Sequence, residues 1–227
     1  MNKSHVLNIV PTPIGNLEDI TLRSLDTLKN SDYILCEDTR VSKKLLNKYN
    51  IEVQLVSFHS FNEHKTVQKH INQILDGKAV SLISDAGTPS ISDPGFLIVR
   101  ESIKNNIEIN CLPGATALIP AIVNSGLSSE RFVFEGFLPT KKGRNKRIKN
   151  LVDEKRSIVI YESPKRILKL INDLMGFLGE DRKASISREL SKIYQENIRG
   201  TLKELYDKLE NINIKGEFVI VIDGKKK

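Results

Sequence analysis

The sequence predicts an α/β protein of two lobes, with a mostly parallel sheet in the first lobe and a mixed sheet in the second. Short runs rich in valine and isoleucine alternate with segments of helical periodicity, which is typical of parallel strands joined by helices. The chain has 227 residues, 39% of them hydrophobic, and can bury one large core or two modest ones. The alternation pauses near Pro113, which predicts domains at residues 1–113 and 114–227.

Five apolar runs and four amphipathic segments make up the predicted first lobe. The expected strands are VLNIVPT (6–12), DYILCE (32–37), VQLVSF (53–58), AVSLIS (79–84) and IEINCL (107–112). The expected helices are TLRSLDTLKNS (21–31), VSKKLLNKYN (41–50), HKTVQKHINQILDG (64–77) and GFLIVRESIKNN (95–106). In the first helix Leu22, Leu25 and Leu28 form a core stripe, and Thr21 or Asp19 is available as the N-cap.

The second lobe repeats this mixture of strands and helices. An apolar helix, ATALIPAIVNSGL (115–127), leads into the strands RFVFEGF (131–137), SIVIYES (157–163), KASISRE (183–189) and GEFVIVID (216–223). The helices between them are KRILKLINDLMGFL (165–178) and TLKELYDKLEN (201–211). The segment SKIYQENIRG (191–200) is consistent with an antiparallel strand, which makes the predicted sheet mixed.

The net charge of +7 at pH 7, with a sequence pI near 9.3, favours polyanionic partners, although a lysine-rich solvated surface explains it equally well. Cys36 and Cys111 lie in strand-like runs with no CxxC or Cys/His cluster nearby, so we expect reduced, buried thiols and neither a metal site nor a disulfide. No apolar run is as long as the about 18 residues needed to cross a bilayer. The first residues lack the pattern of a secretory signal peptide. These features predict a cytoplasmic protein with no membrane partner.

Two loops that follow predicted strands are rich in turn-forming residues. In VPTPIGNLEDITL, Pro13 fixes the backbone and Gly15 permits close approach, as in a ligand loop or a rigid strand-to-helix connection. The second loop is SDAGTPSISDPG (84–95), in which Asp85 directly follows a buried strand. Its carboxylates and hydroxyls either line a ligand pocket or cap turns, and ligands of parallel sheets bind at this end of the strands.

Two further loops carry candidate acid–base groups. Glu37, Asp38 and Arg40 lie in EDTR, either as substrate-orienting residues or as a helix cap with Asp38 or Thr39 at the N-cap position. The loop SFHSFNEHK carries the candidate acid–base residues His59 and Glu63. Its histidines and Glu63 are a weak metal signal, because the context is a loop without cysteine.

A basic run follows the first strand of the second lobe. The segment PTKKGRNKRIKN carries six cations, which attract phosphates and favour nucleic acid over a solvated helix start: Lys141, Lys142, Arg144, Lys146, Arg147 and Lys149. No aromatic RNA-recognition motif accompanies it. The nucleotide-binding signatures GxGxxG and GxxxxGK[ST] are absent, so a Rossmann or P-loop enzyme is not indicated.

The motifs taken together resemble the tetrapyrrole methylase superfamily, and within it the branch that methylates small-subunit ribosomal RNA. The matching segments occur in the same order from Val6 to Asp223: VPTPIGNLEDITLRSL, EDTR, SFHSFNE, SDAGTPSISDPG, LPGATA, SGL, RFVFEGFLP, IYESPKRI and KGEFVIVI. The chain departs from the family pattern at Phe61, where a second histidine is usual, and at PGATA, where PGPCA is usual.

The resemblance implies an S-adenosylmethionine-dependent enzyme that 2′-O-methylates a cytidine ribose in the decoding region of 16S rRNA. It implies two α/β domains with the cofactor in the cleft between them, a homodimer, and the small ribosomal subunit as partner. The residues that it implies around the cofactor are Pro13, Gly15, Ser84, Asp85, Ala86, Gly87, Thr88, Pro113, Thr116, Ala117, Tyr161 and Glu162.

Glu37, Asp38, His59 and Glu63 all remain candidates for the base, with Arg40 as a possible phosphate clamp. Two alternatives stay open for the function. A porphyrin or corrin methyltransferase of the same superfamily is disfavoured by the basic run. A non-catalytic ribosome-binding protein is disfavoured by the retention of every cleft-loop motif.

Overall fold

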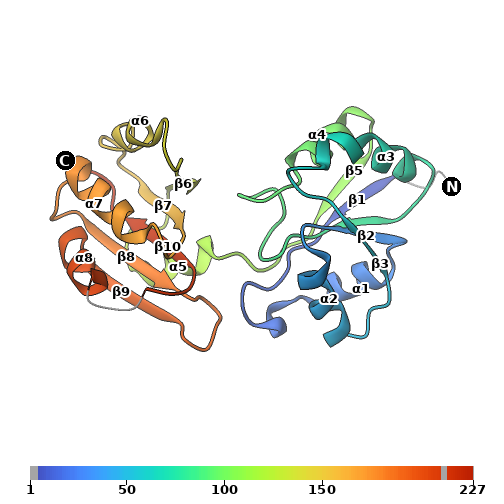
Figure 1. Cartoon of the computed structure of the whole chain (residues 1–227), viewed down its shortest axis with the longest axis horizontal. Helices are drawn as coiled ribbons and strands as arrows, with labels where there is room; N and C mark the ends of the chain where they lie inside the picture. Colours follow the sequence, from blue (N-terminus) through green and yellow to red (C-terminus); the bar gives the residue numbers. More distant parts are fainter. Residues whose placement is uncertain (1–4, 211–213, 227) are drawn as a thin grey trace. The chain divides into compact units, whose positions relative to one another are not determined.

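The computed structural model describes residues 5–210 and 214–226, which form two compact units, Met1–Thr116 (unit 1) and Ala117–Lys227 (unit 2). Each unit contains one five-stranded sheet (Figure 1). This confirms the predicted fold class: the first sheet is parallel and the second is mixed. The last residue of the predicted helix 201–211 lies outside the described residues.

Unit 1 is a parallel sheet in the order β3-β2-β4-β1-β5. Its strands are β1 (Val6–Ile9), β2 (Tyr33–Cys36), β3 (Gln54–Ser57), β4 (Val80–Leu82) and β5 (Glu108–Cys111). Its helices are the 3-10 turn η1 (Leu17–Asp19), α1 (Leu22–Lys29), α2 (Thr39–Lys48), α3 (Glu63–Leu75) and α4 (Phe96–Lys104). Each strand runs into a helix or turn, as the alternation in the sequence predicts.

Alternating side chains of the strands form a core on each face of this sheet. Tyr33 and Leu35 of β2 pack with residues of α3 and α4, whereas Ile34 and Cys36 pack with residues of α1 and α2. Figure 1 shows the two pairs of helices on opposite sides of the strands. Because both faces are covered, all four residues of the central strand β2 are buried, which is the pattern of a parallel sheet.

Three details of unit 1 differ from the expectation. Cys111 is exposed rather than buried, because β5 is an edge strand of the sheet and pairs with β1 alone. Leu22 is 81% exposed, since it is the first residue of α1 and precedes the turn that packs on the sheet; Thr21 is the N-cap. The predicted loop around Glu63 ends earlier than expected, because Glu63 is the first residue of α3.

Unit 2 is a mixed sheet in the order β6-β7-β10-β8-β9. Its strands are β6 (Phe132–Phe137), β7 (Ser157–Glu162), β8 (Lys183–Arg188), β9 (Glu196–Thr201) and β10 (Phe218–Ile222). Its helices are α5 (Leu118–Ser125), α6 (Arg144–Lys149), α7 (Ile167–Leu178) and α8 (Leu202–Glu210). Strands β6 and β7 are parallel and the other pairs are antiparallel, so the predicted antiparallel strand in 191–200 is β9.

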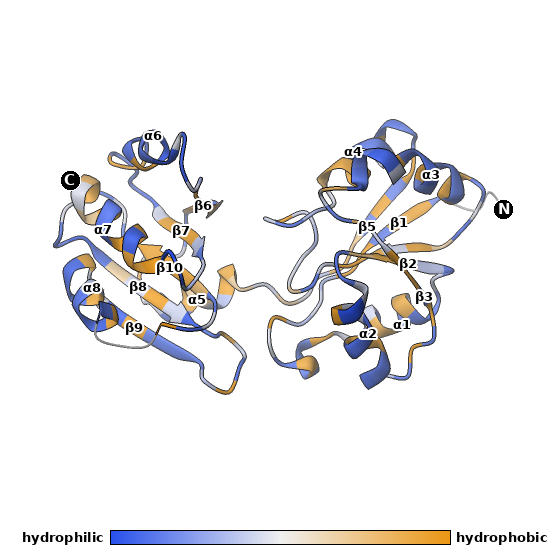
Figure 2. Cartoon of the chain, viewed as in Figure 1, coloured by the Kyte–Doolittle hydropathy of each residue, from blue (hydrophilic) through white to orange (hydrophobic). Residues whose placement is uncertain are grey.

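The main core of unit 2 lies on one face of its sheet. Ile158 and Ile160 of β7 pack there with Ile220 of β10 and with residues of α6, α7 and α8. Helix α5 packs against β8, β9 and β10. Figure 2 shows apolar residues along the strands and mainly hydrophilic residues on α2 and α6. Among the described residues, every helix is too short or too polar to span a bilayer.

Gly95 is required by the turn that starts α4. Its φ is +128°, and a Cβ there would lie 2.7 Å from Ser90 Oγ and 2.8 Å from Leu82 Cδ2. We expect Gly95→Ala to lower the free energy of unfolding by about 2 kcal/mol, because the backbone strain and the clash add. Gly176→Ala is the control, since no atom lies within 4 Å of its Cβ position in α7.

The alanine at position 176 should be neutral or stabilising by up to about 1 kcal/mol, as alanine is the better helix former. Urea unfolding followed by circular dichroism measures both variants. Equal stability of the Gly95 variant and the wild type would show that the 84–95 loop relaxes freely around this position.

Candidate active site

All five strands of unit 1 are parallel, so the loops that follow them meet at one edge of the sheet. The loops after β1 and β4 are joined by an isolated bridge between Thr12 and Gly87. Each residue donates its N–H to the carbonyl of the other, at 2.9 Å in both cases. The buried Thr12 hydroxyl also donates to the Ser84 carbonyl at 2.9 Å. The two turn-rich loops of the sequence therefore form one structure.

The loop after β5 joins the same edge. The Thr88 hydroxyl donates to the Ala115 carbonyl at 3.3 Å. Gly114 passes so close to Pro11 that a Cβ on it would lie 2.6 Å from the proline Cβ, so only glycine fits against the Pro11 ring. The structure thereby brings together three groups of predicted cofactor residues, namely Pro13 and Gly15, residues 84–88, and Pro113 and Thr116. Ala117 follows as the N-cap residue of α5.

The loop after β2 is attached to this edge through Asp85. One carboxylate oxygen of Asp85 accepts the Asp38 N–H at 3.1 Å. Asp38 is the N-cap of α2 and accepts from the Arg40 N–H at 2.8 Å. Its ion pair with the exposed Arg40 guanidinium, at 2.6 Å, helps to hold the pKa of Asp38 down at about 2. Of the two readings of EDTR, the structure shows the helix cap.

Three further carboxyl groups gather beside this turn. Burial raises the pKa of Glu37, and repulsion from Asp85 raises it further, while His59 opposes the rise. Burial likewise raises the pKa of Asp85, against the hydrogen bond from Asp38. The pKa of Asp93 rises to about 7, through burial first and then through repulsion from Glu37 and Asp85. The described residues place no lysine or arginine in an ion pair with Glu37, Asp85 or Asp93.

Asp93 is the member of this acidic group that the sequence does not single out as a site residue. Asp93 and Glu37 are far apart in the sequence, so the sequence does not indicate that their carboxyl groups are close. They are brought near each other because β2 and β4 are neighbours in the sheet. We name Glu37, Asp85 and Asp93 the acidic edge. The loop also holds Ser90 and Ser92 at φ of 72° and 62°, a left-handed conformation that side chains disfavour. Such strain clusters at ligand sites.

The raised pKa of Asp93 predicts a pH-dependent stability. A carboxyl that titrates near 7 when folded and near 3.8 when unfolded binds its proton more tightly in the folded state. The contribution of Asp93 to the free energy of unfolding is therefore full below about pH 4 and is lost as the pH rises through 7. We expect Asp93→Asn to leave stability unchanged at pH 4 and to raise the free energy of unfolding at pH 8 by about 2 kcal/mol.

Urea unfolding of both proteins at pH 4, 6 and 8 checks this expectation. Asp181→Asn is the matched control, because that residue is exposed in unit 2. A constant difference between the Asp93 variant and the wild type across this range would contradict the assignment.

The loop after β3 places His59 near Glu37, as its effect on the Glu37 pKa shows. The His59 Nδ1 accepts the Phe61 N–H at 3.2 Å, so the neutral ring carries its proton on Nε2. Glu63, at the start of α3, has one carboxylate oxygen that is buried and makes no hydrogen bond within the described part of the chain. His59 therefore lies beside the acidic edge. No contact between Glu63 and the acidic edge is found among the described residues.

The residues predicted in unit 2 have structural partners. Glu162 is fully buried at the end of β7, where its carboxylate pairs with Arg166 at 2.6 Å and with Arg144 at 3.6 Å. Arg144 also pairs with Asp173 at 2.7 Å, and Arg147 with Glu135 at 2.5 Å. The expectation that the whole basic run meets phosphates is thus wrong for Arg144, which is buried. The role of Tyr161 and Glu162 toward a cofactor stays a prediction.

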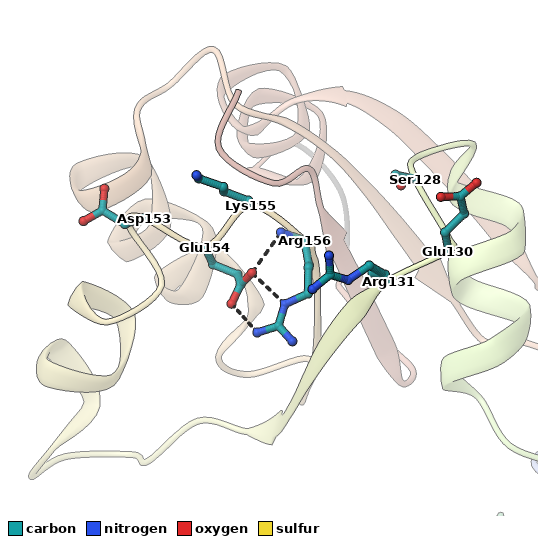
Figure 3. Close-up of a pocket in the computed structure, with 7 residues that line it drawn as sticks. All are labelled: Ser128, Glu130, Arg131, Asp153, Glu154, Lys155 and Arg156. Carbon is teal, nitrogen blue, oxygen red and sulfur yellow. Dashed lines mark hydrogen bonds and ion pairs between the residues drawn. The ribbon is translucent and has the colours of Figure 1, made fainter. Parts of the chain in front are cut away.

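No metal cluster is found in the described residues, and the polar pocket of unit 2 is lined by none of the predicted residues. In the described residues, no group of three or more His, Cys, Asp or Glu side chains is arranged to hold a metal ion. A polar pocket of about 540 Å³ lies in unit 2 (Figure 3), lined by Ser128, Glu130, Arg131, Asp153, Glu154, Lys155 and Arg156. It lies before the first residues of β6 and β7, and Glu154 and Arg156 pair within it at 2.7 Å. Its charges are partly satisfied internally, and it contains none of the predicted residues.

The loops after the parallel strands of unit 1 thus form one candidate ligand site, with loop backbone and carboxylates brought together at the same edge. Residues 6–206 match the family model described as Tetrapyrrole (Corrin/Porphyrin) Methylases. The chain belongs to the tetrapyrrole methylase family, and within it to the group of ribosomal RNA small subunit methyltransferase I.

Two curated relatives show this group. The chain is 44% identical to Ribosomal RNA small subunit methyltransferase I of Thermotoga maritima, over 97% of this chain and 99% of the relative. It is also 44% identical to the protein of the same name from Halalkalibacterium halodurans, over 96% of this chain and 75% of the relative.

Solved structures share the fold at low sequence identity. The cobalt precorrin-4 methyltransferase CbiF superposes with a TM-score of 0.70 at 18% identity, over 98% of this chain and 97% of that one. A diphthine synthase superposes with a TM-score of 0.73 at 14% identity, over 97% and 90%. At such identities the likeness concerns the fold alone.

Proposed function

We propose that the protein is an S-adenosylmethionine-dependent methyltransferase that methylates the 2′-hydroxyl of a cytidine in the decoding region of 16S rRNA, within the small ribosomal subunit. The proposal rests on the meeting of five loops and the acidic edge at one end of the unit 1 sheet, in a chain of this family. The printed names of the relatives support ribosomal RNA as the substrate. We further propose, from the resemblance, that it acts as a homodimer.

The residues of this edge fit S-adenosylmethionine by their chemistry. The cofactor carries a sulfonium and an ammonium group and offers ribose hydroxyls as donors. The acidic edge offers carboxylates whose pKa values are raised by burial and mutual repulsion, so a cationic ligand with hydroxyl donors would be attracted to it. The loops contribute backbone at this edge through the Thr12–Gly87 bridge, and Gly114 fits against the Pro11 ring because it has no side chain.

When bound, S-adenosylmethionine supplies an electrophilic methyl group. Residues 84–88, with Pro13, Gly15, Pro113 and Thr116, would hold it through loop backbone, and Asp85 would accept hydrogen bonds from its polar groups. The chain must also orient the ribose hydroxyl and accept its proton as the new bond forms. Among the four candidate bases we propose Glu37, which is half-buried and has a raised pKa.

Two variants at Asp85 distinguish its proposed contact with the cofactor from its hydrogen bond with the Asp38 N–H. Asp85→Asn removes the charge but keeps an oxygen that can accept the Asp38 N–H, whereas Asp85→Ala removes both. We expect the asparagine variant to bind S-adenosylmethionine about 10-fold more weakly and the alanine variant about 100-fold more weakly, since charged hydrogen bonds are the stronger ones. Calorimetric titration measures both, and unchanged affinity in the two variants would reject the placement of the cofactor at Asp85.

The function itself is tested by methyl transfer. Small ribosomal subunits from a strain that lacks this modification are incubated with the protein and labelled S-adenosylmethionine, and the modified nucleotide is mapped. We expect label on a cytidine 2′-hydroxyl of 16S rRNA. Label on a porphyrin or corrin, or no label with intact cofactor binding, would overturn the proposal in favour of one of the two alternatives.

A further inference from the structure

Three aromatic rings meet on one face of the unit 2 sheet because β6 contains a bulge. Phe134 pairs with Val159 of β7. The register then shifts, so that Phe137 pairs with Tyr161. In a regular strand, residues three apart point to opposite faces. The extra residue at the bulge places Phe137 beside Tyr161, on the face that Val159 and Tyr161 share.

The rings form a patch with fixed geometry, which we name the aromatic patch (Phe134, Phe137 and Tyr161). The ring centres of Phe134 and Tyr161 are 4.9 Å apart, and those of Phe137 and Tyr161 are 5.7 Å apart, both edge to face. The neighbouring β7 residues Ile158 and Ile160 point the other way, into the core. Strand β6 is an edge strand, and Phe137 remains 51% exposed.

Exposed cations follow both strands of the patch. Because β6 and β7 are parallel, the loops after them lie at the same edge of the sheet. Lys141 and Lys142 lie in the first loop and Lys165 in the second; all three are exposed, and none has an ion pair within the described ranges. The Arg144–Glu162 and Arg166–Glu162 pairs hold the ends of these loops together.

We propose that the aromatic patch and the three lysines form a platform for single-stranded RNA. An unpaired base stacks on the exposed ring of Phe137, and Lys141, Lys142 and Lys165 contact the flanking phosphates. Aromatic rings combined with a positive surface are the means by which proteins bind single strands without reading sequence. The inference rests on the proposed function, because a ribosomal RNA substrate supplies the unpaired nucleotide.

Substitutions of Phe137 test the stacking. The probe is a fluorescein-labelled single-stranded RNA decamer, measured by fluorescence anisotropy. Phe137→Leu keeps an apolar side chain but has no π face, so we expect its Kd to rise about 5- to 100-fold. Phe137→Tyr keeps the ring and should bind as the wild type does, and so should Val123→Ala, the control at an exposed apolar residue of α5.

Two independent readouts separate stacking and charge from a general loss of structure. A decamer with 2-aminopurine at its centre should lose fluorescence on the wild type and keep it on Phe137→Leu. For the double variant Lys141→Ala/Lys142→Ala, we expect the slope of log Kd against log salt to fall by about 1.4, at about 0.7 per phosphate lost. Lys169→Ala/Lys208→Ala, at exposed residues of α7 and α8, should leave it unchanged.

The outcomes distinguish this inference from the proposed function. Methyl transfer to 16S rRNA together with unchanged RNA affinity of Phe137→Leu would overturn the platform and leave the function intact. The expected affinity losses in a protein that transfers no methyl group to rRNA would overturn the function and support the platform. If Phe137→Leu changes the sedimentation of the protein from dimer to monomer without weakening RNA binding, the patch is an interface between copies and the inference is wrong.

Discussion

Glu37→Gln is expected to lower the rate of methyl transfer about 100- to 10,000-fold, the range that a general base contributes, while S-adenosylmethionine binding weakens much less because Asp85 and Asp93 remain. Glu37 lies directly after β2, beside Asp85 and His59. Burial and repulsion from Asp85 raise its pKa, which makes the carboxylate a better proton acceptor near neutral pH. The glutamine keeps the size and loses the basicity.

The other candidates are less well placed to accept the proton. Asp38 is occupied by Arg40, which helps to lower its pKa to about 2. His59 uses Nδ1 to accept the Phe61 N–H, so its neutral ring presents an N–H at Nε2 instead of a lone pair. Glu63 lies at the start of α3 with one carboxylate oxygen buried, and no contact between it and the acidic edge is found among the described residues.

Single-turnover methyl transfer to small subunits, measured with saturating cofactor, tests the assignment of the base. The wild-type rate should rise with pH as Glu37 deprotonates, and this rise should vanish in Glu37→Gln. Glu63→Gln is the matched control and should keep both the rate and its pH dependence. Full activity of Glu37→Gln together with loss of activity in a His59 or Glu63 variant would move the base to that residue.

The sequence is most informative about unit 1 because its signals there are local. Apolar runs with helices between them predict each strand of a parallel sheet, and the topology then requires the loops after the strands to share one edge. The hydrogen bond between Asp85 and the 37–40 loop is consistent with this rule, although the sequence alone did not predict it. Asp93 was missed as an acid near Glu37 because the contact depends on strand order, which the sequence does not reveal.

Unit 2 was harder to predict because its features depend on pairing between distant residues. Arg144 looked like one of six similar cations, and only the position of Glu162 and Asp173 in the fold makes it a buried residue. The aromatic patch depends on one bulge in FEGF, and a regular strand would separate Phe134 from Phe137. Cys111 looked buried because an edge strand and a central strand have similar apolar sequences.

Arg144→Met is expected to lower the free energy of unfolding by about 3 to 5 kcal/mol, the cost of removing one partner from a buried ion pair. Arg144 is 4% exposed and bridges Glu162, at 3.6 Å, and Asp173, at 2.7 Å. The Glu162 side chain is fully buried, and it would keep Arg166 and the Ser163 N–H and hydroxyl as partners but lose Arg144. Methionine fills similar volume, so the loss measures charge rather than a cavity.

The double variant Arg144→Met/Glu162→Leu distinguishes lost pairing from lost packing. Removing both charges should recover part of the stability, because the buried carboxylate no longer lacks its partner. Arg156→Ala is the control at a solvent-exposed pair with Glu154 and should have a much smaller effect. Urea unfolding followed by circular dichroism compares the three proteins. If Arg144→Met is no less stable than Arg156→Ala, the buried network does not hold the ends of the β6 and β7 loops, and the lysines of the proposed RNA platform lose their structural support.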